Sequence, residues 1–225
     1  LSSIRFAMVE RWEIALTFIL AAAVIDGMDG RVARLLGATS SFGAQLDSLS
    51  DFVCFGVAPA LVMYIWMLHD IRGIGWAVTL FYVICAALRL ARFNTGLSSA
   101  PKYSWSNQFF TGVPSPAGGV LCLIPLVLFM QLGDELLLEP WMVALHVLII
   151  GVLMASRIPT FAGKNLRIPH DHILPFMVVG SLLIILFIIE PWLMISVLAG
   201  VYGLSIAASI WRYRVLLSLS QSKDI

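Results

Sequence analysis

The stretch WEIALTFILAAAVIDGMDGRVARLLGATSSFGAQLDSLSD, residues 12–51, sets the interpretation of the whole chain. It begins with an apolar run over residues 12–30, close to the roughly 20 apolar residues that a membrane helix needs. A turn through residues 37–41 follows, and a second apolar run starts near Phe42. The stretch therefore predicts two membrane helices folded into a hairpin, with acidic side chains close to the turn.

The composition agrees with a membrane protein. Of 225 residues, 60% are hydrophobic and 12% are charged, whereas soluble domains have about 45–50% apolar and about 25% charged residues. The net charge of +1 gives no indication of a nucleic-acid partner. The cysteines Cys54, Cys85 and Cys122 lie in apolar runs, and their spacing fits neither a zinc site nor a disulfide framework.

Seven apolar segments are candidate membrane spans, and together they predict an all-α, polytopic helical bundle. These segments are residues 12–30, 42–68, 74–95, 113–132, 140–156, 172–189 and 191–211. We expect one integral-membrane domain over residues 1–225, with a catalytic hairpin at 12–68. Pro191 separates the last two spans, because proline cannot continue the preceding helix. The chain starts with Leu1, and we expect a leading helix to precede it.

The charged residues fall unequally on the two sides that seven alternating spans define. One side collects Arg31, Arg34, Arg89, Arg92, Lys102, Arg157, Lys164, Arg167, Arg212, Arg214 and Lys223. The other side collects the basic residues Arg11 and Arg72, with Arg5 near it if a helix precedes the chain, and the acidic residues Glu10, Glu13, Asp70, Asp134, Glu135, Glu139 and Glu190. Lys and Arg mark the cytoplasmic side of membrane proteins, so we expect the basic side to face the cytoplasm.

Four aspartates lie near the predicted hairpin turn. Asp26 and Asp29 are three residues apart, Asp47 and Asp51 are four apart, and both spacings place side chains on one helical face. Unpaired charges are costly in a bilayer, so cations or protons must compensate such a cluster. Oxygen ligands without His or Cys favour Mg²⁺, Mn²⁺ or Ca²⁺, and two such ions can clamp a phosphoryl group. The cluster therefore predicts a divalent-metal site.

Small residues on the same hairpin support a nucleotide site. Gly30, Ala33 and Gly43 remove bulk, so that a flat base and a pyrophosphate could approach the backbone, and Arg34 could meet phosphate oxygens. Two alternatives stay open at this point. The aspartates could pair structurally with arginines, or they could line the path of an ion- or proton-coupled transporter, which more often spreads its acids over several helices.

The pattern Asp26-x2-Asp29-Gly30-x2-Ala33-Arg34-x8-Gly43-x3-Asp47-x3-Asp51 resembles the full signature of the CDP-alcohol phosphotransferase family. The resemblance implies that the four aspartates ligate metal, with Asp51 also serving as the general base. It implies that Gly30, Ala33 and Gly43 line the cytidine pocket and that Arg34 lies near the diphosphate. The implied cofactor is a pair of Mg²⁺ or Mn²⁺ ions, with Ca²⁺ as an inhibitory or structural substitute. Transfer from a CDP-linked lipid to a hydroxyl, with loss of CMP, is the implied reaction.

Three further segments, which begin at Arg89, Phe110 and Ser156, resemble the phosphatidylserine synthase branch of this family. That branch transfers a phosphatidyl group from CDP-diacylglycerol to L-serine. Candidate residues for binding serine or phosphate are Arg89, Arg92, Asn94, Arg157 and Lys164, although plain positive-inside topology also accounts for basic residues here.

A sister enzyme that uses glycerol 3-phosphate or inositol phosphate is the alternative within the family. The resemblance also implies a homodimer. We expect it in the bacterial inner membrane, and the basic side of the spans predicts an active site that faces the cytoplasm.

Overall fold

The computed structural model describes residues 1–35, 41–96, 109–133, 138–161 and 173–221. Its α-helices are α1 (Ser2–Ala7), α2 (Trp12–Leu35), α3 (Ser41–Asp51), α4 (Ala58–Trp66), α5 (Arg72–Gly96), α6 (Ser115–Cys122), α7 (Ile124–Leu132), α8 (Pro140–Ala155), α9 (Ile173–Ile189) and α10 (Pro191–Gln221). A π-helix, η1 (Phe52–Val57), joins α3 to α4, and a 3₁₀-helix, η2 (Leu68–Ile71), joins α4 to α5.

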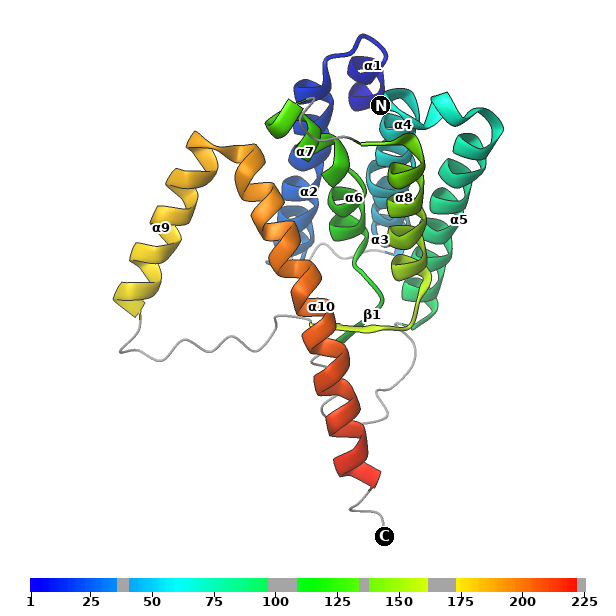
Figure 1. Ribbon diagram of the computed structural model, residues 1–225. Helices are drawn as coiled ribbons and strands as arrows, with labels where there is room; N and C mark the ends of the chain where they lie inside the picture. The colour runs from blue at the N-terminus through cyan, green and yellow to red at the C-terminus, as the bar shows by residue number, and fades with distance from the viewer. Residues whose placement is uncertain (36–40, 97–108, 134–137, 162–172, 222–225) are drawn as a thin grey trace.

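The structure confirms the prediction of a polytopic helical bundle, because each of the seven predicted spans is helical (Figure 1). Among the described residues, four helical stretches are long and apolar enough to cross a membrane: Phe42–Trp66, Leu68–Thr95, Ser115–Leu132 and Pro191–Arg212. Two shorter apolar helices, Pro140–Ala155 and Met177–Ile189, accompany them. The break before Pro191 is confirmed, since α9 ends at Ile189 and α10 begins at Pro191.

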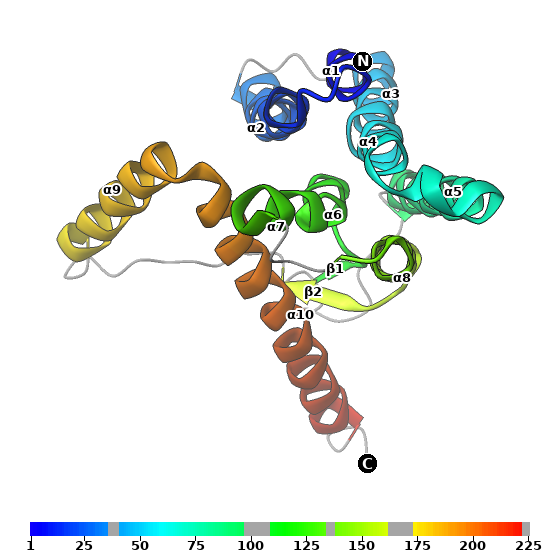
Figure 2. The same cartoon turned by 45° about the horizontal axis from the view of Figure 1, so that its top comes forward.

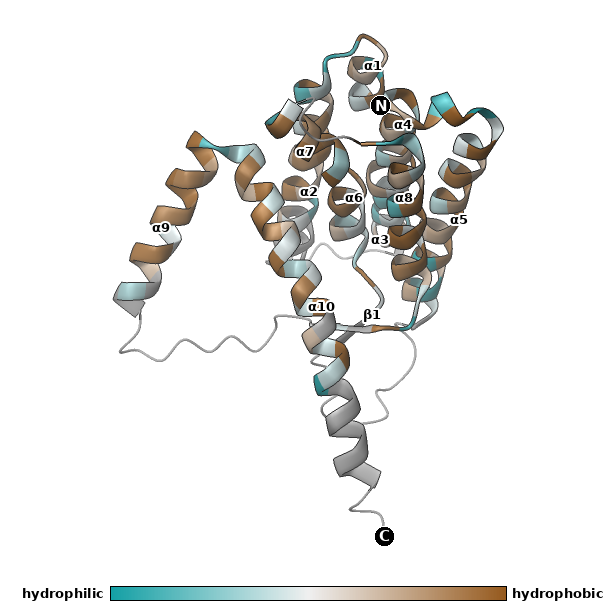
Figure 3. Ribbon diagram, viewed as in Figure 1, coloured by the Kyte–Doolittle hydropathy of each residue, from teal (hydrophilic) through white to brown (hydrophobic). Residues whose placement is uncertain are grey.

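The core lies among α1, α2, α4, α5, α6, α7 and α8, whose apolar side chains form one buried cluster. Leu16, Met63, Tyr82, Leu126 and Met154 are among its largest fully buried members. In contrast, α9 stands away from this core and packs on α10 (Figure 2). The large side chains that the structure describes on α9, from Met177 to Ile189, are exposed, and Figure 3 colours most of this helix as apolar. Such a surface fits contact with lipid, where apolar side chains need no cover.

The π-helix η1 starts immediately after Asp51 and interrupts an otherwise continuous span. Its wider turn packs closely on two neighbours, α5 and α6. A Cβ added at Gly56 would lie 3.0 Å from the Cβ of Ala86, so this approach of η1 to α5 depends on glycine. The Tyr82 hydroxyl donates a hydrogen bond to the Phe55 carbonyl at 3.1 Å, which satisfies one backbone oxygen of the π-helix.

A small antiparallel sheet lies at the end of the bundle where α5 and α8 terminate (Figure 1). It pairs β1 (Phe109–Thr111) with β2 (Pro159–Phe161). The sheet was not predicted, and it adds a non-helical element to the all-α bundle. Gly112 follows β1 with a φ of +78°, and a Cβ there would lie 2.8 Å from the Met154 carbonyl oxygen. Only glycine combines this φ with so close an approach to the backbone.

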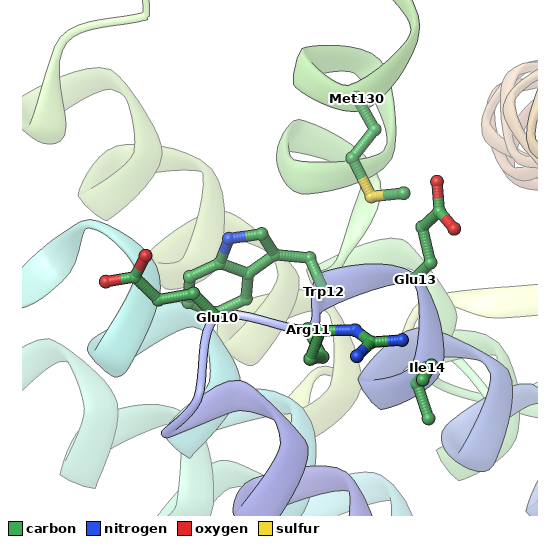
Figure 4. A pocket seen from close by; sticks show the side chains of 6 residues that line it. All are labelled: Glu10, Arg11, Trp12, Glu13, Ile14 and Met130. Carbon is green, nitrogen blue, oxygen red and sulfur yellow. The ribbon is translucent and has the colours of Figure 1, made fainter.

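A shallow pocket of about 300 Å³ lies at the opposite end of the bundle, where the chain turns from α1 into α2. Its lining residues are Glu10, Arg11, Trp12, Glu13, Ile14 and Met130. Met130 reaches from α7 towards Trp12 and Glu13, and the charged groups point in different directions (Figure 4). None of the predicted site residues lines this pocket.

Candidate active site

Three of the predicted aspartates meet between α2 and α3. Carboxylate oxygens of Asp26, Asp47 and Asp51 all lie within 4.8 Å of one another. Asp26 and Asp51 are half-buried, and Asp47 is exposed, so the cluster opens towards solvent on one side. Asp51 interacts with both of the other carboxylates. The predicted convergence of two acidic helix faces is therefore observed for these three residues.

Helix geometry explains why these carboxylates converge. Asp47 and Asp51 are one turn apart on α3, and residues four apart share a face. Asp26 lies on α2, the other arm of the predicted hairpin. Three carboxylates at this separation repel one another unless cations or protons compensate them. A set of oxygen ligands without nitrogen or sulfur suits hard divalent cations. The residues present therefore fit a metal ion of this class.

The remaining hairpin residues are only partly described. The side chain of Asp29 and the surroundings of Gly30, Ala33 and Arg34 lie outside the described residues, although their backbone continues α2. Gly43 is on the exposed first turns of α3, one turn before Asp47. The predicted roles of these residues in nucleotide binding remain predictions.

Asn94 connects the end of α5 to the acidic helix. Its side-chain amide and the Ser48 hydroxyl are hydrogen-bonded at 3.1–3.2 Å. Ser48 follows Asp47 directly and also donates to the Ala44 carbonyl at 3.0 Å. Asn94 thus lies beside the acid cluster, and its hydrogen bond holds α5 against α3. Its predicted role in acceptor binding remains a prediction.

Arg89 is half-buried and is fixed by hydrogen bonds. Its Nε donates to the Val113 carbonyl, and its Nη1 donates to the Ser115 hydroxyl at 2.7 Å. Ser115 is buried at the start of α6, so these hydrogen bonds fix the junction between β1 and α6. The guanidinium also interacts electrostatically with Asp51. Positive-inside topology alone therefore does not account for Arg89.

Arg92 has a different role from Arg89. Its Nη1 donates to the Ala155 carbonyl at 2.6 Å and to the Ser156 carbonyl at 3.3 Å. A cation at the carboxyl end of α8 also complements the helix dipole. These contacts give Arg92 a structural role, which is to hold α5 against the end of α8. Arg157 is exposed just beyond α8, and Lys164 lies outside the described residues.

Two polar side chains of the helical core interact with neighbouring elements. His146 on α8 has its Nε2 2.8 Å from the Leu121 carbonyl of α6. Tyr202 on α10 was not predicted as a site residue, yet it interacts with Arg89. A tyrosine in an apolar span gives no sequence signal that separates it from the core residues around it.

These helices and carboxylates define an integral membrane protein with an acidic, metal-competent centre at one end of its bundle. Comparison with known proteins is more specific. The sequence profile of the CDP-alcohol phosphatidyltransferase family matches residues 1–156, which include the whole acid cluster. The chain belongs to this family.

The relatives extend the similarity beyond the profile. A protein of Mycobacterium leprae (strain TN) is 37% identical over 224 residues, covering 100% of this chain and 74% of the relative. A Helicobacter pylori (strain 26695) protein is 34% identical, with 89% and 81% covered. A Methanocaldococcus jannaschii protein is 34% identical, with 84% and 81% covered. All three are named CDP-diacylglycerol–serine O-phosphatidyltransferase.

Proposed function

We propose that the protein is a phosphatidylserine synthase that transfers the phosphatidyl group of CDP-diacylglycerol to L-serine and releases CMP. The observation that carries this proposal is the convergence of Asp26, Asp47 and Asp51 within 4.8 Å, in a chain of this family. The names of relatives that span most of the chain support serine as the acceptor. We take residues 1–225 as one domain with its catalytic hairpin at 12–68.

The proposed ligands of two Mg²⁺ or Mn²⁺ ions are Asp26, Asp29, Asp47 and Asp51. When bound, these ions would supply positive charge that stabilises the departing CMP phosphate. Gly30, Ala33 and Gly43 would leave room for cytidine, and Arg34 would bind the diphosphate. Ca²⁺ would occupy the same oxygen ligands without supporting turnover.

Asp51 is the proposed general base. It would accept the proton of the serine hydroxyl as that oxygen attacks the phosphorus of the phosphatidyl group. One P–O bond forms to serine while the P–O bond to CMP breaks, so phosphatidylserine and CMP are the products. Half-burial suits Asp51 for this role better than Asp47, which is exposed. The electrostatic interaction of Asp51 with Arg89 supports this proposal, because a cation near the base would also lie near the bound acceptor.

The site would face the cytoplasm of a bacterial inner membrane. The basic ends of α5 and α10 support this orientation, since Lys and Arg concentrate on the cytoplasmic side. We also propose that the enzyme is a homodimer, which measurement of the molecular mass in detergent would test.

The test is CMP release by the purified protein in detergent with CDP-diacylglycerol, Mg²⁺ or Mn²⁺, and one acceptor at a time. L-serine should support turnover, and Asp51→Asn should lower kcat by about 10²-fold or more. Turnover with glycerol 3-phosphate or inositol phosphate, and none with serine, would assign the sister activity. Metal or proton flux into vesicles without CMP release would instead indicate the transporter alternative.

A further inference from the structure

The hydroxyl of Tyr202 is buried and makes no hydrogen bond to any of the described residues. Buried tyrosine hydroxyls usually find a partner, because an unpaired polar group in the interior is costly. Ser209 repeats the pattern seven residues further along α10, with a fully buried side chain whose hydroxyl has no described partner. Two such groups on one face of α10 indicate that a polar molecule meets this face.

The surroundings of Tyr202 identify the chemistry of that molecule. Thr160 on β2 is the neighbouring hydroxyl; it donates to the Gly112 carbonyl at 2.9 Å, and its oxygen keeps lone pairs that can accept, but the Tyr202 hydroxyl does not meet it with the geometry of a hydrogen bond. Arg89 supplies the nearby positive charge, and its Nε and Nη1 are committed to the β1–α6 junction. A hydroxyl donor and a guanidinium together favour a small anion, and a carboxylate matches both.

We propose that Tyr202 donates a hydrogen bond to the carboxylate of the acceptor amino acid, with Arg89 as the counter-charge. This inference rests on the proposed function and assigns α10 to acceptor recognition. Arg89 interacts with Asp51 as well as with Tyr202, so an acceptor beside Arg89 can direct its carboxylate to Tyr202 and its hydroxyl to Asp51. Tyr202 thereby selects amino-acid acceptors and takes no part in proton transfer.

The test compares two Tyr→Phe variants, which both remove one hydroxyl and keep the ring. Tyr202→Phe should raise the KM for L-serine about 10-fold or more, as loss of a hydrogen bond to a charged group predicts, and leave the KM for CDP-diacylglycerol unchanged. Its thermal stability without substrates should be equal to or above that of the wild type, because the hydroxyl has no described partner. Tyr82→Phe is the matched control, since that hydroxyl donates to Phe55. It should lower thermal stability and leave the KM for serine unchanged.

The remaining outcomes overturn the inference. If Tyr202→Phe lowers thermal stability as Tyr82→Phe does, the hydroxyl has a structural partner. If Tyr202→Phe changes the KM for CDP-diacylglycerol and not that for serine, α10 serves the lipid instead. If the wild type itself uses no amino acid and turns over another acceptor, the proposed function fails together with this inference. Normal serine kinetics of the wild type with an altered CDP-diacylglycerol KM in Tyr202→Phe would overturn this inference alone.

Discussion

The acid cluster predicts that Asp51→Asn stabilises the metal-free protein and weakens the stabilisation that added metal gives. Two unit charges at 4.8 Å repel by about 3.5 kcal/mol at an effective dielectric constant of 20. Asp51 faces two such neighbours, Asp26 and Asp47. Solvent at the exposed Asp47 and the attraction of Asp51 to Arg89 reduce this net repulsion, so we expect Asp51→Asn to raise the free energy of unfolding by about 1–3 kcal/mol without metal.

The effect should reverse when metal is added. A metal ion at 100 times its Kd stabilises a folded protein by about 2.7 kcal/mol, and Asp51→Asn removes one of its ligands. The assay is thermal unfolding in detergent, followed by tryptophan fluorescence in EDTA and then in Mg²⁺ or Mn²⁺. The variant should unfold at a higher temperature than the wild type in EDTA and gain less from metal.

A matched control is Asp70→Asn at the opposite end of the bundle. Among the described residues, the Asp70 carboxylate forms an exposed ion pair with His69 at 3.3 Å, and such pairs contribute little. This variant should therefore match the wild type in both conditions. If Asp51→Asn instead lowers stability in EDTA and keeps the full response to metal, the three carboxylates do not form a shared cation site.

Four further predictions concern the packing around the site and the metal. Arg89→Lys should lower CMP release at least about 10-fold, because one ammonium cannot replace two guanidinium donors at fixed positions, and steady-state kinetics in detergent will measure it. Gly112→Ala should lower the free energy of unfolding by about 1–3 kcal/mol, because φ at this position is +78° and the new Cβ would clash with the Met154 carbonyl oxygen. A thermal unfolding temperature equal to that of the wild type would contradict this strain argument. Gly56→Leu should force η1 away from Ala86 and reduce both stability and activity, whereas unchanged unfolding would show that the helices can separate freely. EDTA should abolish CMP release, and Mg²⁺ or Mn²⁺ should restore it; metal-independent turnover would exclude the proposed chemistry.

The sequence predicts the features that depend on local pattern. Apolar run length defines the spans, and the three- and four-residue spacings place Asp26, Asp47 and Asp51 on faces that can meet. The arrangement of helices in space is not local, and the separation of α9 from the core is visible only in the structure.

The features that could not be predicted arise from tertiary contact. The paired strands are three residues long, which is too short for the alternation of apolar and polar residues that marks a strand to be recognised in the sequence. Arg89 and Arg92 have the same sequence signature, yet one bonds to the start of α6 and the other to the end of α8. Their different roles follow from which backbone oxygens the fold presents to them.

The π-helix after Asp51 has a consequence for how this enzyme tolerates changes in length. Each residue of an α-helix advances the side chains by about 100°, and a π turn absorbs one additional residue. A single-residue deletion within Phe52–Val57 would therefore restore a regular α-helix and keep Asp51 in phase with the core-facing half of the span. The same deletion in the regular α-helix of α4 would not be absorbed, so it would rotate the acidic and apolar faces of this span against each other by about 100° and turn the carboxylates away from α2.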